Sequence, residues 1–177
     1  MVIAVAELER RNIPFDCAFT PGAIAFPDWD WKQLGDLWAD GEAELLDRRG
    51  TRTIRVRGKI RGLAEGACSR CLRAVAAPIE REFDLFYYPM PVIERSGETR
   101  IGSGDTEIGF YEEEGIELRD VIGEQAVLSL PARALCGENC RGICPMCGAV
   151  NKKCSCKPSS ADPRWDGLRN LKVKRKQ

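Results

Sequence analysis

The chain of 177 residues contains no histidine. An active site or metal site that uses imidazole as a base or as a ligand is therefore excluded. The sequence also lacks the roughly 20 consecutive apolar residues that a membrane-spanning helix needs. Residues Met1–Arg11 do not have the basic and then apolar layout of a secretion signal. We therefore expect a cytoplasmic protein whose thiols stay reduced and which has no membrane partner.

The signatures of common enzyme classes are also missing from the sequence. It has no glycine-rich phosphate loop after a strand, no nucleophile elbow and no carboxylate pair on one helical face. We therefore expect no catalytic residues and no small-molecule substrate. The apolar share of 44 % and the charged share of 31 % are typical of a globular protein with one real core and a small second part.

Cysteine, by contrast, is abundant and clustered. Cys17 is left over, and the other eight of the nine cysteines lie in short-spaced sets. The eight are Cys68, Cys71, Cys136, Cys140, Cys144, Cys147, Cys154 and Cys156. Ligands that lie one to four residues apart can turn two sulfurs toward one ion, so the pattern predicts two all-thiolate zinc sites. Sites closed by four thiolates are structural, because a catalytic metal keeps one position open.

The division of the eight cysteines between two ions has two solutions. In the favoured one, Cys68 and Cys71 join Cys136 and Cys140, while the four later cysteines fold back on one another. In the other solution, the four cysteines from Cys136 to Cys147 share one ion. An iron–sulfur cluster also takes four thiolates, and a metal-free reduced tail is a further alternative.

Two segments predict paired strands. Residues 53–61 and 79–86 alternate apolar and charged side chains, which is the period of a half-buried strand. The charges are basic in the first segment and acidic in the second. We therefore expect two antiparallel strands whose opposite charges pair across the ladder. The alternative is that the basic row forms an RNA-binding stripe. The first pair of cysteines would lie in the connection between these strands.

Two helices complete the expected core. Glu117–Ser129 has its apolar residues at helical spacing, and a short helix could run from Asp28 or Asp30 to Leu37. The prediction is an α+β fold with an antiparallel sheet or small partly open barrel and a metal-stapled, cysteine-rich C-terminal tail. We expect an α+β core domain of residues 1–135 with a central Cys-x2-Cys knuckle. A zinc-binding, cysteine-rich and basic tail of residues 136–177 would follow.

A net charge of zero hides an uneven distribution. Residues 80–120 carry twelve acids against four arginines, whereas residues 136–177 carry ten lysines and arginines against three acids. A basic tail can neutralise phosphates and release their counterions. The alternative is a tail that is merely solvated or touches the protein's own acidic belt. The candidate nucleic-acid-binding residues are Lys152, Lys153, Lys157, Arg164, Arg169, Lys172, Lys174, Arg175 and Lys176.

The cysteine-rich segments resemble those of a known family. Residues Leu135–Gly148, followed by Asn151 and Cys154-Ser155-Cys156, resemble the C-terminal motif of the YceD-like family. Its members are known as large ribosomal RNA subunit accumulation proteins. Four further segments are similar to the family in the same order, namely Cys68–Leu72, the acidic and aromatic strand after it, Leu128–Pro131, and Asp162–Trp165 with Leu168 and Leu171. The resemblance covers roughly Leu34 to Leu171.

The resemblance implies a bacterial or plastid protein, cytoplasmic or stromal, that supports accumulation of the large-subunit ribosomal RNA and is associated with a small ribosomal protein of that subunit. No enzymatic activity is established for the family. We therefore expect a non-enzymatic ribosome assembly factor that binds this RNA, a ribosomal protein, or both. The alternative function is a redox-responsive or chaperone-like protein whose thiolates release zinc on oxidation.

Overall fold

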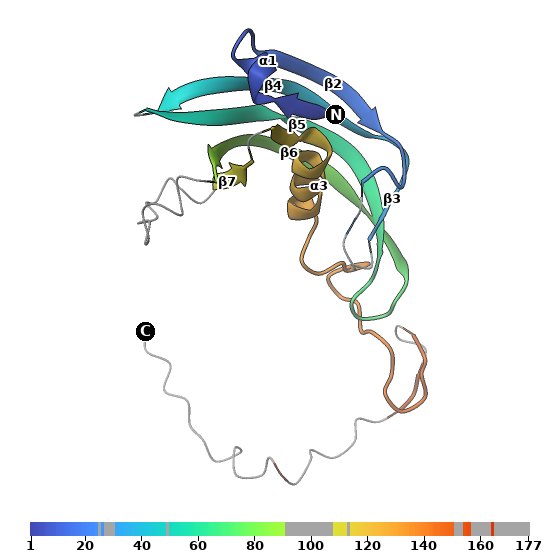
Figure 1. The fold of residues 1–177 in the computed structure, drawn as a ribbon. Helices are drawn as coiled ribbons and strands as arrows, with labels where there is room; N and C mark the ends of the chain where they lie inside the picture. The colour runs from blue at the N-terminus through green and yellow to red at the C-terminus, as the bar shows by residue number, and fades with distance from the viewer. Residues whose placement is uncertain are drawn as a thin grey trace, which may run out of the picture.

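Strands make up most of the fold, and two helices accompany them in the part of the chain that is described (Figure 1). The computed structural model describes residues 1–24, 26, 31–48, 50–90, 108–112, 114–150, 154–156 and 164. The elements in chain order are β1 (Val2–Ala4), α1 (Val5–Leu8), β2 (Ile13–Phe19), β3 (Lys32–Gln33), β4 (Leu37–Arg48), β5 (Thr51–Ala67), β6 (Ala74–Pro89), β7 (Ile108–Tyr111), β8 (Gly115–Glu117) and α3 (Leu118–Ser129). Neither helix has the length and hydrophobicity of a membrane span.

The central feature is an open mixed sheet of six strands. Its strands follow one another in space as β2, β4, β5, β6 and β7, and β3 pairs with β5 beside that path. Neighbouring strands are antiparallel except β6 and β7, which are parallel. Strands β1 and β8 form a separate two-stranded sheet. The predicted α+β fold with clustered cysteines suited to metal binding is confirmed. Of the two predicted forms, the strands form an open sheet and not a barrel.

Strands β5 and β6 form a long hairpin whose side chains alternate between two faces. The inner face presents the buried side chains Ile54, Val56, Ile60, Ile79, Phe83 and Leu85. On the other face, the register places Arg57 opposite Asp84 and Lys59 opposite Glu82. The predicted antiparallel pairing and the predicted facing of basic and acidic rows are therefore confirmed.

Helix α3 packs on the inner face of the sheet, and the helix predicted over Glu117–Ser129 is confirmed with a start at Leu118. Its apolar residues Val121, Ile122 and Ala126 are buried. A polar contact joins the two layers, because Arg81 of β6 donates a hydrogen bond to Oε1 of the buried Gln125 at 2.9 Å. The helix thereby covers β5 and β6 on one face of the sheet.

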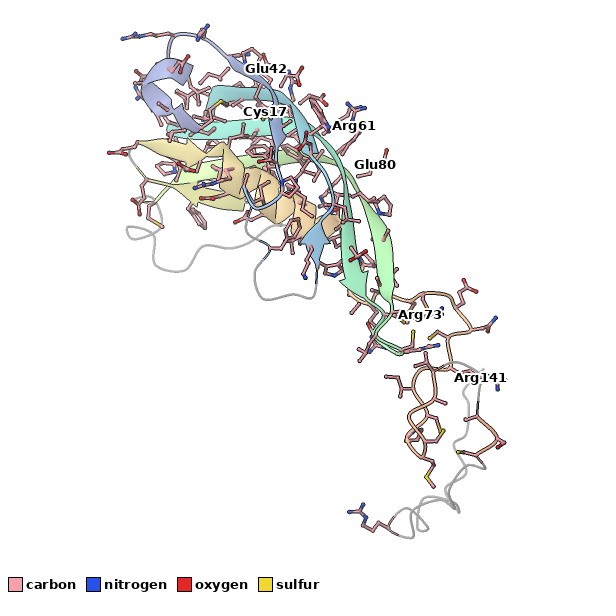
Figure 2. The ribbon with its side chains drawn as sticks, turned by 90° about the vertical axis from the view of Figure 1, so that its right-hand side faces the viewer. Cys17, Glu42, Arg61, Arg73, Glu80 and Arg141 are labelled. Atoms are coloured by element: carbon pink, nitrogen blue, oxygen red, sulfur yellow. The ribbon has the colours of Figure 1, made fainter. Side chains whose placement is uncertain are left out.

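The opposite face, here called the outer face, is turned away from α3. Figure 2 shows Glu42, Arg61 and Glu80 along it. Strand registers assign to the outer face Asp16 and Ala18 of β2, Trp38, Asp40, Glu42 and Glu44 of β4, Arg55, Arg57, Lys59, Arg61 and Leu63 of β5, and Pro78, Glu80, Glu82, Asp84 and Phe86 of β6.

The short helix expected to end at Leu37 is wrong. Its predicted N-cap residues, Asp28 and Asp30, lie outside the described residues, but Lys32–Gln33 forms β3 and Leu37 begins β4. Between them, Gly35 has a φ of +72°, a left-handed conformation through which a right-handed helix does not continue. Pairing with the long hairpin therefore decides the structure of this segment.

The tip of the hairpin carries the first two cysteines. Strand β5 ends at Ala67 and β6 begins at Ala74, so Cys68 and Cys71 lie in the connection between them, as predicted. Because Ala67 pairs with Ala74, the ladder continues up to this loop. The hairpin extends past α3, and the chain that leaves α3 runs back to its tip (Figure 1).

Candidate metal centres

The structure gathers the eight clustered cysteines into two groups of four. One group consists of Cys68, Cys71, Cys136 and Cys140, and the other of Cys144, Cys147, Cys154 and Cys156. Within each group the sulfur atoms all lie within 4.8 Å of one another. The grouping is the favoured of the two divisions expected from the sequence. The first group is called cluster 1 below and the second is called cluster 2.

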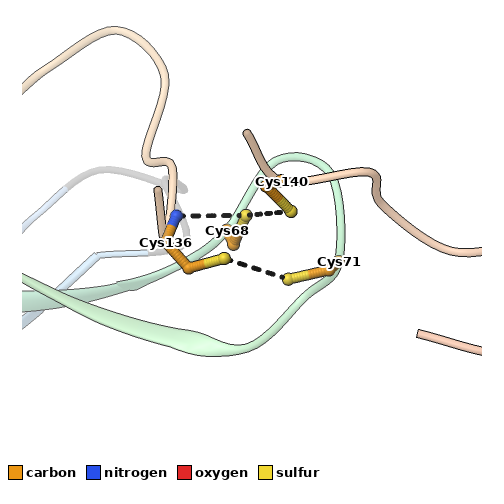
Figure 3. Close-up of side chains that lie close together, drawn as sticks. All are labelled: Cys68, Cys71, Cys136 and Cys140. Atoms are coloured by element: carbon orange, nitrogen blue, oxygen red, sulfur yellow. Dashed lines mark hydrogen bonds between the residues drawn. The ribbon is translucent and has the colours of Figure 1, made fainter. Parts of the chain in front are cut away.

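Cluster 1 joins the hairpin tip to the segment that follows α3 (Figure 3). Sγ of Cys68 lies 3.9 Å from Sγ of Cys140, and Sγ of Cys71 lies 3.5 Å from Sγ of Cys136. Cys68 is fully buried, while Cys71 and Cys140 are 3 % and 7 % exposed. The cluster is therefore shielded from solvent on most sides and connects residues that are far apart in the sequence.

Hydrogen bonds hold the two segments of cluster 1 together around the sulfurs. The Ser69 amide donates to the carbonyl oxygen of Ala134 at 2.8 Å. The Arg70 guanidinium donates to two carbonyl oxygens, those of Glu138 at 3.1 Å and Cys140 at 2.8 Å. The segment after α3 is thus fixed on the hairpin tip by polar contacts in addition to the cysteines.

One side chain donates directly to a sulfur of cluster 1. A guanidinium nitrogen of Arg73 lies 3.2 Å from Sγ of Cys136. Four thiolates around a divalent cation leave a net negative charge, and a guanidinium at this position offsets part of it. The sequence analysis missed Arg70 and Arg73, and their positions beside Cys71 are the signal that could have identified them.

The two clusters are built on the same kind of hairpin turn. The Leu72 amide donates to the carbonyl oxygen of Cys68 at 2.9 Å, and the Gly148 amide donates to that of Cys144 at 2.8 Å. In each turn the amide of the first cysteine donates at 2.8 Å to the carbonyl oxygen five residues later. Both turns therefore aim two sulfurs to the same side, which is the arrangement of a zinc knuckle.

The pairing around the two turns is also equivalent. In cluster 1, Ala67 before the first cysteine pairs with Ala74, three residues after the second cysteine. In cluster 2, an isolated antiparallel bridge joins Ile143 to Val150 at the corresponding positions. The first turn ends a long hairpin of the main sheet, whereas the second is supported by this single bridge.

The backbone of both turns needs a left-handed residue directly after the second cysteine. Gly148 occupies this position in cluster 2 with a φ of +70°. In cluster 1 the same position holds Leu72, with a φ of +60° and 68 % of its surface exposed. A left-handed conformation costs an L-residue about 1–2 kcal/mol relative to glycine, so the first turn is strained where the second is not.

Backbone amides also favour the thiolate form of the first cysteine in each turn. The pKa of Cys68 is lowered to about 6 by hydrogen bonds from the amides of Cys136 and Arg70. The pKa of Cys144 is lowered to about 6 by hydrogen bonds from the amides of Cys147 and Met146. Thiolates are the form that binds metal, so these amides prepare both sulfurs as ligands at neutral pH. For Cys68 the first of them comes from the segment after α3 and not from the turn itself.

The sulfur positions fit one tetrahedral ion per cluster. A zinc–sulfur bond length of about 2.3 Å places the sulfurs of a tetrahedron about 3.8 Å apart, and the two distances in cluster 1 are 3.9 Å and 3.5 Å. A disulfide bond would need about 2.05 Å between the sulfurs. All nine cysteines are free. The two clusters are therefore suited to metal ions rather than to disulfide bonds.

The basic residues predicted to contact nucleic acid lie mostly beyond the described part of the chain. Arg164 is described, and it is exposed. Outside the described residues lie Lys152, Lys153, Lys157, Arg169, Lys172, Lys174, Arg175 and Lys176. Their role in binding RNA stays a prediction.

The fold and the clusters define a β-rich protein with two four-cysteine sites suited to metal ions, one of which ties the segment after α3 to the sheet. The model of the family described as "Large ribosomal RNA subunit accumulation protein YceD" matches residues 56–172. The chain belongs to this family, as its cysteine motifs predict.

Two mycobacterial relatives match nearly the whole chain. A protein of Mycobacterium tuberculosis described as uncharacterized is 29 % identical over 179 residues, which cover 95 % of this chain and 79 % of the relative. A protein of Mycobacterium bovis with the same description matches with the same identity and the same coverage. No solved structure matches the chain.

Proposed function

We propose that this protein is a non-enzymatic factor that supports accumulation of the large-subunit ribosomal RNA and assembly of the large ribosomal subunit. The observation that carries the proposal is the family match over residues 56–172, a range that contains all eight cysteines of the two clusters. The description of the family names accumulation of this RNA. We also propose that the protein acts in the cytoplasm, where thiols stay reduced.

We propose zinc as the metal of both clusters. The spacing of the sulfurs supports one ion per cluster, because an iron–sulfur cluster distributes its four thiolates over several iron atoms and so spreads them farther apart. Four thiolates close the coordination of zinc and make its role structural. Zinc in cluster 1 would then hold residues 136–177, predicted as a tail, on the core of residues 1–135. This division into domains stays a prediction.

We propose that the basic tail makes the contacts with RNA, alone or together with contacts to a ribosomal protein. Each phosphate neutralised by a lysine or arginine steepens the dependence of log affinity on log salt concentration by about 0.7–0.9. Replacing Lys172, Lys174, Arg175 and Lys176 together with alanine should therefore flatten the slope by roughly two to four. A variant with the wild-type slope and affinity would remove the tail from the RNA contact.

A second candidate function is a redox-responsive protein. The observation that favours it is the exposure of Cys147, Cys154 and Cys156 in cluster 2. Exposed thiolates are accessible to oxidants, and their oxidation releases zinc. In this case the loss of zinc from cluster 2 under oxidising conditions would change the function of the protein in cells.

The proposed function is tested in cells that lack the protein. We expect the ratio of large-subunit to small-subunit ribosomal RNA to fall, and we expect the wild-type gene to restore it. An unchanged ratio would contradict the assembly role. A variant with all four cysteines of cluster 2 replaced by serine separates the two candidates, because a redox role predicts that this variant behaves without stress as the wild-type protein does under oxidative stress.

Elemental analysis of the purified protein tests the metal. Two clusters predict about two zinc ions per chain in metal-replete protein. Iron in place of zinc, or one stably bound ion per chain, would refute the assignment.

A further inference from the structure

The outer face of the sheet carries an exposed apolar patch at the end of the sheet near β3. Trp38 is 52 % exposed and Leu63 is 40 % exposed. Trp38 pairs in register with Arg61, and Leu63 is the next outer-face residue along the same strand, so the two apolar side chains are diagonal neighbours. The exposed residues Ala18 and Pro78 lie opposite them on the flanking strands. A tryptophan that is half exposed beside a second exposed apolar side chain on a sheet face is typical of a contact site.

On the outer face, four rows of side chains run across the strands, and in them the basic residues of β5 lie between the acidic residues of β4 and β6. The carboxylates of these rows are those of Asp16, Asp40, Glu42, Glu44, Glu80, Glu82 and Asp84. The cations are those of Arg55, Arg57, Lys59 and Arg61. Seven carboxylates thus face four cations within these rows, and Arg48, which lies over the Phe86 ring, is a fifth cation on this face.

Each of the four cations is already neutralised by the protein itself. Arg55 lies 2.6 Å from Asp84 and 3.1 Å from Glu44, and Lys59 lies 2.7 Å from Glu82. The ion pairs of the other two cations measure 2.9 Å for Arg57 with Glu42 and 3.6 Å for Arg61 with Asp40. The surplus on this face is therefore negative, and it repels the phosphates of a nucleic acid.

One pair of acids on this face works against the stability of the fold. The register places Asp16 directly opposite Asp40, and like charges in this position destabilise an antiparallel pair. Asp16 is exposed, and among the described residues it makes no ion pair. An acid that costs stability without gaining a partner is expected where a binding surface needs its charge.

We propose that the outer face docks a cationic polypeptide segment of another protein. An aliphatic or aromatic side chain of that segment lies against Trp38 and Leu63, and its lysines or arginines face Asp16 and the neighbouring carboxylates. The inference rests on the proposed assembly role for its setting. It deepens that role, because it separates a protein-binding face on the sheet from the RNA contacts assigned to the tail.

The test uses a photo-crosslinking amino acid in the full-length protein in cells. It replaces Leu63, next to the retained Trp38, and in a control strain it replaces Leu128, which is 61 % exposed on α3. We expect a polypeptide to be crosslinked from position 63 and the same polypeptide not to be crosslinked from position 128. Mass spectrometry should identify in these adducts a polypeptide whose lysines and arginines outnumber its acids. An RNA adduct, an acidic polypeptide, a crosslink to this chain's own tail, or no adduct would overturn the proposal.

The captured polypeptide is then purified and titrated against variants of the protein. Asp16→Lys and Trp38→Ala should each weaken binding by about tenfold or more, and Leu128→Ala should leave it unchanged. Asp16→Lys should at the same time raise the melting temperature, because it turns a repulsive pair into an attractive one. A purely structural role of Asp16 predicts no change in binding. Wild-type affinity in both outer-face variants would overturn the proposal.

The same variants separate this inference from the proposed function. If cells without the protein lose large-subunit RNA but Asp16→Lys and Trp38→Ala restore it fully, the docking face is wrong and the assembly role stands. If the RNA level does not depend on the protein at all, the assembly role is wrong, and the crosslinks from position 63 still decide whether the face docks a cationic partner.

Discussion

The two cysteine clusters share one turn but have different surroundings. Both turns have equivalent hydrogen bonds and an equivalent strand pair at their base. Cluster 1 ends the long β5–β6 hairpin and is largely buried, whereas three of the four cysteines of cluster 2 are exposed. The local sequence is enough to make a metal-binding turn. The rest of the fold decides whether that turn joins two parts of the chain or presents itself to solvent.

This difference predicts different roles for the two ions. An ion in cluster 1 crosslinks residues about seventy positions apart, such as Cys68 and Cys140, whose separation is 72. An ion in cluster 2 closes a local loop between Cys144 and Cys156. Closing a long loop removes more conformational freedom from the unfolded chain than closing a short one. Cluster 1 should therefore stabilise the fold, and cluster 2 should shape a local surface.

The largest expected effect comes from removing one ligand of each cluster. Cys71→Ser should lose one zinc ion and lower the free energy of unfolding by about 4 kcal/mol or more, as losses of structural metals do. It should also release the segment 134–142 from Ser69 and Arg70 and speed trypsin cleavage there. Cys147→Ser should lose one zinc ion and lower the free energy of unfolding by less than about 1 kcal/mol.

The matched control is Cys17→Ser. Cys17 lies on β2 outside both clusters, so this variant should keep about two zinc ions. In each variant, chemical denaturation measures the free energy of unfolding, elemental analysis measures the zinc content, and limited proteolysis measures the rate of trypsin cleavage in segment 134–142. Equal losses of stability in Cys71→Ser and Cys147→Ser would show that the buried cluster is no more structural than the exposed one.

The second prediction concerns the order in which the metal ions leave. A chromophoric chelator should remove zinc in two phases, with the ion of cluster 2 leaving first, because its sulfurs are accessible. A thiol-specific reagent should modify Cys147, Cys154 and Cys156 before it modifies Cys68. Mass spectrometry after partial modification assigns the fast phase. A fast phase that maps to cluster 1 would show that the ion of cluster 1, and not that of cluster 2, is the more accessible one.

Much of this arrangement could be predicted from the sequence, because it depends on short-range patterns. The alternation of residues 53–61 and 79–86 fixes the hairpin and the facing of its charges. The connection between these strands then has to carry Cys68 and Cys71. The close spacing of the later cysteines favours the observed grouping into two sets of four. These inferences need only the period of a strand and the reach of a short turn.

The parts that could not be predicted depend on long-range packing. Strand β4 covers Leu37–Arg48, but its inner positions include Gly41 and Ala43, which are too small to mark an apolar face in the sequence, and Gly41 lies under the Phe15 ring. A Cβ at Gly41 would come within 2.6 Å of the Phe15 ring. The parallel pairing of β7 with β6 and the burial of cluster 1 are equally set by contacts distant in sequence.

The third prediction tests the guanidinium that touches a sulfur of cluster 1. Arg73→Gln removes the hydrogen bond to Cys136 and should weaken metal binding at cluster 1 by about 10–100-fold. Arg73→Lys should recover part of this loss, since it keeps the charge but not the planar fork. Cobalt titration measures both clusters in one sample, so the affinity of cluster 2 serves as an internal reference.

A spectroscopic readout separates this role from a merely structural one. Loss of a hydrogen bond to a coordinating thiolate should shift the sulfur-to-cobalt charge-transfer band of cluster 1. If Arg73→Gln lowered stability without moving that band or the affinity, Arg73 would only support the backbone of the loop.

The smallest expected effects come from exchanging the left-handed residues of the two turns. Leu72→Gly removes a penalty of about 1–2 kcal/mol at a φ of +60°, while glycine adds about 0.5–1 kcal/mol of unfolded-state entropy. The net expectation is a stabilisation of about 0.5–1 kcal/mol, measured by chemical denaturation of metal-replete protein. Gly148→Leu should have the opposite sign, and its effect should appear as weaker metal binding at cluster 2.

Leu72→Ala decides between strain and side-chain contacts as the reason for these effects. Alanine keeps the left-handed penalty but removes the side chain, which is 68 % exposed. If strain dominates, Leu72→Ala stays close to the wild type in stability, and only Leu72→Gly gains. If both variants are destabilised by similar amounts, the Leu72 side chain contributes more through its contacts than its backbone loses through strain. The two turns would then differ in the contacts of the residue directly after their second cysteine, as well as in how deeply they are buried.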